Sequence, residues 1–346
     1  MRARELGLRL GELDPGPLDA ITDVGGVRVG HATIVAGDEV RTGVTVVMPP
    51  TEALFAGTHR LNGNGEFTGL EWIRESGLLT SPIAITNTHS VGTVHEALIA
   101  AGAARQAHDS PWDLPAVAET WDGVLNDING FHVRAEHVDE ALRDASDGPV
   151  REGSVGGGTG MICHGFKGGI GTASRTTEVG TVGVLVQANH GRRPRLMVDG
   201  VPVGRELGPD RVPLPPETAM PGAGSIIVIA ATDAPLLPHQ CDRLAQRAAL
   251  GVARTGGAGE NSSGDQVLAF ATGNRGLAGG DRAQVTMLAN DRLDPLFYAV
   301  IEATEEAIVN AMLAAETMTG RAGTVYALEA DVLADVMRRH GRLHER

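Results

Sequence analysis

The chain has 346 residues and a mass of 36.0 kDa, and its 29 basic and 43 acidic residues give a formal net charge of −14. Glycine contributes 47 residues, about twice its ordinary share, whereas only 3% of the residues are aromatic. A hydrophobic content of 42% without a Gly-X-Y repeat excludes a disordered or collagen-like chain. The acidic balance argues against nucleic acid or an anionic membrane as partner. These numbers favour a globular enzyme that acts on a small molecule or peptide.

Short runs rich in β-branched residues predict interior strands, and helical patterns lie between them. The predicted strands cover residues 43–48, 82–87, 181–187, 225–230 and 267–271. The predicted helices cover residues 94–106, 238–254, 296–317 and 330–339. This mixture predicts an α/β or α+β fold in which helices pack on sheets.

One segment, residues 194–224, contains seven prolines and five glycines. Proline is excluded from helix interiors and central strands, so we expect an exposed, extended stretch. It ends in Ala223 and Gly224, and a predicted strand begins at Ser225. Two interpretations stay open: a processing site that leads into a buried strand, or an ordinary surface loop.

The compartment is predicted from cysteine usage and from apolar runs. Cys163 and Cys241 form neither a disulfide framework nor a CxxC metal pair, and we expect both to be buried small side chains. The first residues lack the apolar run of a signal peptide, and no stretch of about 18 apolar residues occurs. We therefore expect a cytoplasmic protein with no membrane partner.

Common catalytic and ligand-binding motifs are missing from the sequence. The glycine-rich stretch 156–168 departs from the phosphate-loop pattern, and there is no HExxH and no GxSxG. The twelve histidines lack metal-ligand spacing, so we expect no metal and no cofactor. His89, His164 and His190 lie near glycines and could be catalytic, although a structural role is the more common one.

A serine that follows glycine at the start of a strand fits one further kind of chemistry. If the Gly224–Ser225 bond is cleaved by the serine hydroxyl, glycine tolerates the unusual backbone that this attack requires. The new α-amino group, with an unperturbed pKa of about 8, can then act as general base without a histidine. This is the logic of an N-terminal nucleophile.

Seven segments, in order and spacing, resemble one known family. They are residues 21–31, 63–69, 119–127, 153–160, 182–189, 224–232 and 263–265. Together they are similar to the self-processing L-aminopeptidase/D-esterase-amidase family, which includes the β-peptidyl aminopeptidases. The resemblance extends from about residue 15 to residue 320.

The resemblance implies an αββα sandwich similar to N-terminal-nucleophile hydrolases, with the connectivity shared with ornithine acetyltransferases. It implies that one domain, residues 1–346, is cleaved at Gly224–Ser225 into residues 1–224 and 225–346. It also implies a homo-oligomer of processed pairs.

The resemblance further assigns site residues. Ser225 matches the nucleophile and new N-terminus, and Asn189 matches the asparagine of the oxyanion hole. Ser263 and Asp265 match a pair that orients groups near the nucleophile and relays protons; some members have glutamate where this chain has the shorter Asp265.

The binding of the substrate's free amino group is assigned to two further residues. Glu119 matches the acidic residue that receives the amine, which restricts the enzyme to chain ends. Trp121 lies where the family often has tyrosine, so the ring and an N–H donor are kept and the hydroxyl is lost.

The implied activity is that of a serine aminopeptidase, amidase or esterase that releases N-terminal amino acids through an acyl-enzyme on Ser225. One alternative is acyl transfer of the ornithine acetyltransferase type, but that family uses threonine in an Ala-Thr-Gly context, which Gly224-Ser225 fits poorly. The other is an unprocessed, non-catalytic homologue. Side-chain preference, α- or β-peptide preference and stereochemistry are left open.

Overall fold

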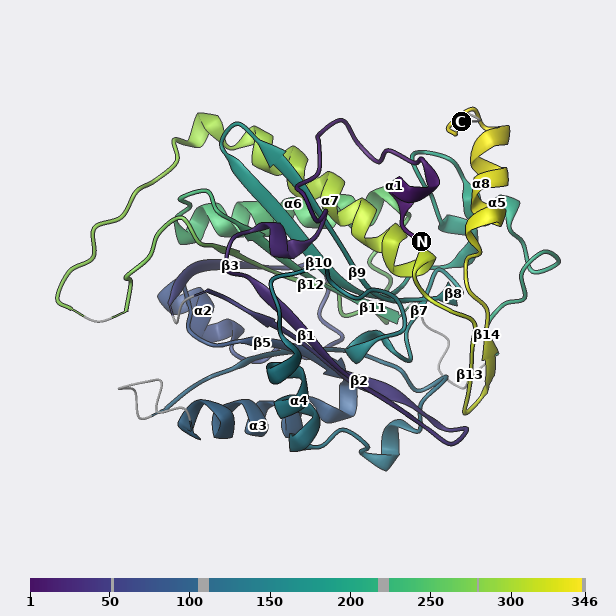
Figure 1. Cartoon of the computed structure of the whole chain (residues 1–346), viewed down its shortest axis with the longest axis horizontal. Helices are drawn as coiled ribbons and strands as arrows, with labels where there is room; N and C mark the ends of the chain where they lie inside the picture. The colour runs from purple at the N-terminus through teal and green to yellow at the C-terminus, as the bar shows by residue number, and fades with distance from the viewer. Residues whose placement is uncertain (51–52, 105–111, 217–223, 279, 344–346) are drawn as a thin grey trace.

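Two β-sheets lie face to face between layers of helices in the structure, a computed structural model of the chain (Figure 1). It describes residues 1–50, 53–104, 112–216, 224–278 and 280–343. The strands in these ranges are β1 Arg28–Ala36, β2 Val40–Met48, β3 Leu54–Arg60, β4 Leu78–Leu79, β5 Ile83–Asn87, β6 Ala116–Thr120, β7 Ile162–Cys163, β8 Phe166–Lys167, β9 Gly169–Thr177, β10 Gly180–His190, β11 Gly224–Thr232, β12 Gln266–Ala271, β13 Met318–Gly320 and β14 Gly323–Val325.

The helices in the same described ranges include α-helices and 3-10 helices. The α-helices are α1 Ala3–Leu6, α2 Leu70–Ser76, α3 Val91–Ala104, α4 Ala135–Asp144, α5 Val203–Glu206, α6 Pro238–Arg254, α7 Asp294–Leu313 and α8 Ala330–Arg339. The 3-10 helices are Ile21–Asp23, Thr88–Ser90, Ile128–Gly130, Gly156–Gly158, Arg193–Arg195 and Asn290–Arg292.

The layers follow the order helix, sheet, sheet, helix. The four-stranded sheet has the order β1-β2-β5-β6, and the six-stranded sheet has the order β4-β3-β12-β11-β10-β9. Helices α3 and α4 cover the outer face of the first sheet, and α6 and α7 cover the outer face of the second (Figure 1). The predicted αββα sandwich is therefore confirmed.

Strand β11 is buried on both faces, which explains its continuous run of apolar residues. Ile226 and Val228 pack into the cluster under α6 and α7, whereas Ile227 and Ile229 pack between the sheets. Because side chains alternate along a strand, Ser225 lies on the same side as Ile227, toward the space between the sheets.

Strand β9 was not predicted, because glycine, serine and threonine replace the β-branched apolar residues of the other strands. Its small residues let α7 pack closely on the sheet. A Cβ at Gly171 would overlap the carbonyl oxygen of Ala307 in that helix.

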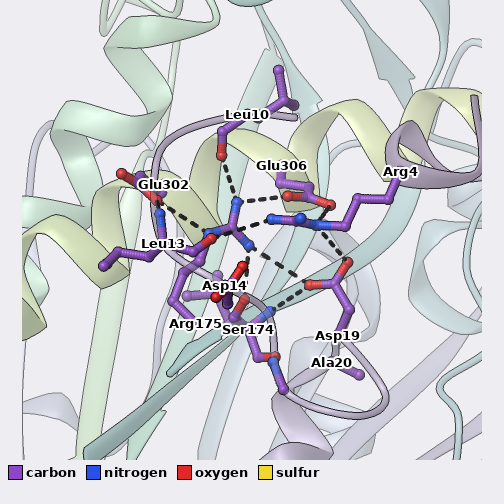
Figure 2. A network of polar contacts seen from close by, with 12 residues as sticks. Arg4, Leu10, Leu13, Asp14, Asp19, Ala20, Ser174, Arg175, Glu302 and Glu306 are labelled. Atoms are coloured by element: carbon purple, nitrogen blue, oxygen red, sulfur yellow. Dashed lines mark hydrogen bonds and ion pairs between the residues drawn. The ribbon is translucent and has the colours of Figure 1, made fainter. Parts of the chain in front are cut away.

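A buried network of ion pairs and hydrogen bonds connects the N-terminal segment to α7 and β9 (Figure 2). Arg175 of β9 is fully buried, 3.2 Å from the Glu302 carboxylate and 2.6 Å from that of Glu306. Its guanidinium also donates to the carbonyl oxygen of Leu10 at 2.6 Å, and Arg4 lies 3.0 Å from Glu306. Two helix carboxylates thus hold arginines from two distant parts of the chain.

Three of the four predicted helices agree closely with the structure at their starts, and two agree at both ends. Helices α6 and α8 have exactly the predicted bounds. Helix α7 ends at Leu313 rather than at residue 317, and strand β13 begins at Met318. Helix α3 begins at Val91, three residues before the predicted start, and residues 105–106 of the prediction lie outside the described residues.

The prediction that residues 194–224 form an exposed, extended stretch is wrong for its first half. This half contains a 3-10 turn and α5, and Val198, Val203 and Leu207 are fully buried in the core. The prolines separate short turns whose apolar residues pack inward. Residues 217–223 of the segment lie outside the described residues.

Both cysteines are free and buried, as predicted. None of the helices in the described ranges combines the length and the apolar character needed to cross a membrane.

Candidate active site

Gly224 and Ser225 open strand β11 beside the end of β10. Ser225 is 6% exposed and is the ladder partner of Asn189. Gly224 has φ +66°, a left-handed conformation that favours glycine, and a Cβ there would overlap the carbonyl oxygen of Asn189. Backbone conformation and close approach therefore both require glycine before the serine.

The segment 263–265 surrounds the Gly224–Ser225 bond. The amide N–H of Gly264 donates to Ser225 Oγ at 2.9 Å. The Ser263 hydroxyl donates to the carbonyl oxygen of Gly224 and lies 2.9 Å from Asp265 Oδ1. One loop thus contacts both the hydroxyl and the carbonyl of this dipeptide.

Asp265 is held in place by backbone hydrogen bonds. Its Oδ1 accepts from the Ile226 amide at 3.1 Å, and its own amide donates to Asn62 Oδ1 at 2.6 Å. Burial, more than any other cause, raises the pKa of this carboxyl to about 6, although hydrogen bonds from Ser263 and Ile226 oppose the shift. The group can therefore change its protonation state close to neutral pH.

Asn189 lies across from Ser225 with its side-chain amide fixed at both ends. Its Oδ1 accepts from the Ile162 amide at 2.8 Å, and its Nδ2 donates to the Trp121 carbonyl oxygen at 3.0 Å. A Cβ on Gly224 would lie 3.1 Å from this Nδ2. Since an amide nitrogen carries two hydrogens, a second donor remains beside the Gly224 backbone.

Glu119, near the end of β6, is 3% exposed. Its carboxylate accepts from the Glu66 amide at 3.0 Å and from the Thr88 hydroxyl. Burial raises the pKa of this carboxyl, while those two hydrogen bonds lower it. A Cβ on Gly65 would lie 2.9 Å from Glu119 Oε1 and 3.2 Å from Gly264 Cα, so a single glycine separates Glu119 from the Ser225 loop.

Trp121 contacts the other site residues through its backbone carbonyl rather than through its ring. Its carbonyl oxygen orients Asn189, whereas its half-buried indole packs with the small apolar cluster of Val124, Leu125 and Val325. The structure thus gives the Trp121 ring to the apolar cluster and only its carbonyl oxygen to Asn189.

The sequence analysis missed several groups that complete this arrangement. They are the amide of Gly264, the hydroxyl of Thr88 and the side chain of Asn62. Gly264 lies inside the Ser263-Gly-Asp265 segment, and its position between two polar residues was the one available signal.

A cavity of about 330 Å³ adjoins the site. Gly65, Glu66 and Gln266 belong to its wall, and Gln266 Nε2 donates to the Gly65 carbonyl oxygen at 3.0 Å. Arg60, Phe67, Trp72, Arg74 and Leu114 also line the cavity. The cavity therefore begins at the loop that separates Glu119 from Ser225.

The three histidines considered as catalytic candidates lie apart from the Ser225 hydroxyl. His89 stacks on Phe131, and His164 and His190 pack against each other on the other face of β10. Burial lowers the pKa of His164 to about 4 and that of His190 well below its usual value, so both rings are neutral. Within the described ranges the Oγ of Ser225 is bonded to an amide, not to an imidazole.

Comparison with known proteins places this chain in one family. Peptidase family S58 matches residues 19–326. The beta-peptidyl aminopeptidase BapA of Sphingosinicella microcystinivorans is 47% identical over 370 residues, which cover 99% of this chain and 93% of that protein.

Solved structures agree with this assignment over the whole chain. A Burkholderia sp. beta-aminopeptidase superposes with a TM-score of 0.93 at 54% identity, covering 99% of each chain. The L-aminopeptidase D-Ala-esterase/amidase of Ochrobactrum anthropi, described as a prototype for the serine aminopeptidases and a variant of the Ntn hydrolase fold, gives 0.90 at 43% identity, also covering 99% of each chain.

Proposed function

Because the chain belongs to peptidase family S58 and is an aminopeptidase-type hydrolase, we propose that Ser225 is the nucleophile of two successive reactions. The first cleaves the chain at Gly224–Ser225, and the second hydrolyses peptides, amino acid amides or esters at their amino ends. The observation that carries this proposal is the Ser263–Gly264 loop, which contacts both the Gly224 carbonyl and the Ser225 hydroxyl.

In the first reaction Ser225 Oγ attacks the carbonyl carbon of Gly224. The C–N bond to Ser225 breaks, its nitrogen takes the proton that the Oγ hydroxyl gives up, and an ester to Oγ forms. Water then hydrolyses this ester and leaves residues 1–224 and 225–346. Ser263 supports the step by donating to the Gly224 carbonyl oxygen, on which negative charge develops.

In the second reaction the freed α-amino group of Ser225 takes the hydroxyl proton and returns it to the leaving amine. Asn189 Nδ2 stabilises the oxyanion, since it keeps one donor after bonding the Trp121 carbonyl. Water then releases the acyl group from Ser225. Asp265 and Ser263 orient the groups around the nucleophile.

Glu119 is proposed to hold the substrate's ammonium group. A buried carboxylate is stabilised by a cationic partner, which here would be supplied by the substrate. The arrangement selects chains with a free amino end, which is what an aminopeptidase needs. Trp121 contributes through its carbonyl oxygen, which accepts from Asn189 Nδ2 and so orients that amide.

The proposal is tested with purified protein by intact-mass measurement and by hydrolysis of an aminoacyl p-nitroanilide. We expect a fragment that begins at Ser225 from the wild-type chain, and neither fragment nor hydrolysis from Ser225→Ala. Activity that persists in Ser225→Ala, or full hydrolysis by an uncleaved wild-type chain, would disprove the mechanism.

Glu119→Gln separates amine recognition from the chemistry. The substitution keeps the shape and removes the charge, so the KM for substrates with a free amine should rise at least about tenfold. Self-cleavage, which involves no free amine, should proceed at nearly the wild-type rate. Equal loss of both reactions would contradict the assigned role.

We also propose that the protein acts in the cytoplasm and that processed pairs assemble into a homo-oligomer. Light scattering of the processed protein measures the assembly directly. A mass equal to one 36.0 kDa pair would contradict it.

A further inference from the structure

A second cluster of reactive side chains lies behind β10, on the face opposite Asn189. Its members are Cys163 at the end of β7, His164 next to it, and His190 at the end of β10. One possible donor atom from each lies within 4.8 Å of the other two, and all three residues are buried. The proposed hydrolytic mechanism uses none of them.

The separation of these atoms is close to that found around a tetrahedral metal ion. Cys163 Sγ lies 3.8 Å from His190 Nδ1. Zinc bonds to sulfur and nitrogen at tetrahedral angles would bring such a pair to about 3.6 Å. The ring of His164 packs edge-on against that of His190, with centroids 5.1 Å apart. Small side-chain rotations would therefore close the three donors around one ion.

The two imidazoles also have unused nitrogens. Nε2 of His164 and Nε2 of His190 are buried and, within the described ranges, have no hydrogen-bond partner. A buried polar atom without a partner destabilises the folded state. Each ring therefore offers an unpartnered nitrogen to a ligand, and in His190 either Nε2 or the Nδ1 beside Cys163 Sγ can be the donor atom.

We propose that Cys163, His164 and His190 bind one thiophilic metal ion of the Zn²⁺ type. A thiolate and two neutral imidazoles are the donors that Zn²⁺ favours, and three protein ligands leave a fourth position for water. On binding, the Cys163 thiol loses its proton to solvent and a sulfur–metal bond forms, with no change in oxidation state.

The groups around this cluster determine how tightly it would bind a metal ion. Burial lowers the pKa of Lys167 to about 7, and its charged form interacts electrostatically with Cys163, repelling a cation while stabilising the thiolate. Its Nζ is held by the carbonyl oxygens of Gly158 at 3.3 Å and Gly168 at 2.8 Å. We therefore expect weaker, reversible binding compared with a four-ligand structural zinc site.

Strand β10 connects this site to the proposed active site. His190 follows Asn189 directly and is the ladder partner of Gly224. An ion that holds the His190 ring restrains the strand end that positions the Asn189 amide. Bound metal should therefore change the rates of self-cleavage and hydrolysis, a consequence that rests on the proposed function, whereas metal binding itself does not.

Cobalt replaces zinc as the spectroscopic probe, because a cysteine thiolate bound to Co²⁺ gives a charge-transfer band in the near ultraviolet. Because the site is buried, full-length protein is produced with Co²⁺ in the medium. Further Co²⁺ is then titrated into the purified protein. We expect the band and about one Co²⁺ per chain for the wild type and for Cys241→Ala, the matched variant of the other buried cysteine. Cys163→Ala should show no band.

His164→Asn provides a second test that keeps the cysteine. His164 has φ +50°, and asparagine is also tolerated in this conformation, so the backbone is preserved. Loss of an outer-shell partner alone weakens metal binding about 10- to 100-fold, so loss of a ligand should weaken Co²⁺ binding at least as much. This variant decides the matter if Cys163→Ala does not fold.

The proposal is overturned if the wild-type protein shows no thiolate–cobalt band, or if Cys163→Ala or a folded His164→Asn retains the wild-type band and affinity. All measurements are repeated in the Ser225→Ala chain. Binding that persists there shows that the metal site is independent of cleavage, so a failure of the proposed function would leave the metal result intact.

Discussion

At the scale of single residues, Ser263 connects the groups of the proposed cleavage site. Its hydroxyl contacts both the Gly224 carbonyl oxygen and the Asp265 carboxyl group, yet it has only one proton to donate. Where this proton goes depends on the charge of Asp265. An ionised carboxylate draws it away from Gly224, whereas a neutral carboxyl leaves it free to polarise the Gly224 carbonyl.

Ser263→Ala should slow self-cleavage by about 100-fold or more, the usual effect of losing one oxyanion donor. The rate is measured from the disappearance of the intact chain on denaturing gels. Equal rates for Ser263→Ala and wild type would remove Ser263 from the mechanism.

The pKa of Asp265, raised to about 6, predicts a pH dependence of the same reaction. Below pH 6 the carboxyl is neutral and the Ser263 proton reaches Gly224, so self-cleavage should slow as pH rises through about 6. Asp265→Asn stays neutral and should lack this inflection. Rates of freshly refolded precursor, measured from about pH 5 to about pH 8 on both sides of the Asp265 pKa, decide the question.

At the scale of elements, the charge network between β9, α7 and the N-terminal segment shows how much depends on one arginine. Arg175 satisfies the buried carboxylates of Glu302 and Glu306 and two backbone carbonyl oxygens, those of Leu10 and Ser174. Removing one partner of a buried ion pair leaves an uncompensated charge, which costs more than the pair contributes.

Arg175→Met should therefore lower the free energy of unfolding by about 3–5 kcal/mol. Urea denaturation in the Ser225→Ala background keeps both proteins as one chain. Arg175→Met/Glu306→Gln should recover part of the loss, because the double variant also removes the Glu306 charge that Arg175 would otherwise have compensated. A loss below about 1 kcal/mol would mean that the network is effectively exposed to solvent.

The same elements show what sequence reasoning could and could not predict. Strand β11 and helix α6 were predicted because their apolar residues follow the period of a buried strand or an amphipathic helix. Strand β9 was missed because its small polar residues serve close packing with α7, a requirement set by a distant helix.

The residues of the candidate site were likewise predicted only in part. Ser225, Asn189 and the 263–265 segment stood out by their order along the chain, and the structure brings them together. The contact of Gly65 with both Glu119 and Gly264 depends on how two loops about 200 residues apart meet, which no local pattern encodes. Cys163 and His190 became neighbours for the same reason.

At the scale of the whole molecule, the proposed cleavage divides a sheet whose strands interleave. In the order β4-β3-β12-β11-β10-β9, the two central strands belong to residues 225–346 and the outer four to residues 1–224. Strand β11 is paired with β10 on one side, and β12 is paired with β3 on the other.

The two fragments should therefore stay together after cleavage. Separating them would break both ladders and expose the apolar faces of β11 and β12, together with the core under α6 and α7. We expect the fragments to elute together in size-exclusion chromatography, in equal amounts, and to separate only in denaturant. Because β11 and β12 cannot leave without unfolding the sheet, removal of denaturant from mixed, separated fragments should restore activity slowly, if at all. Fragments that separate in native buffer would contradict this interleaved arrangement.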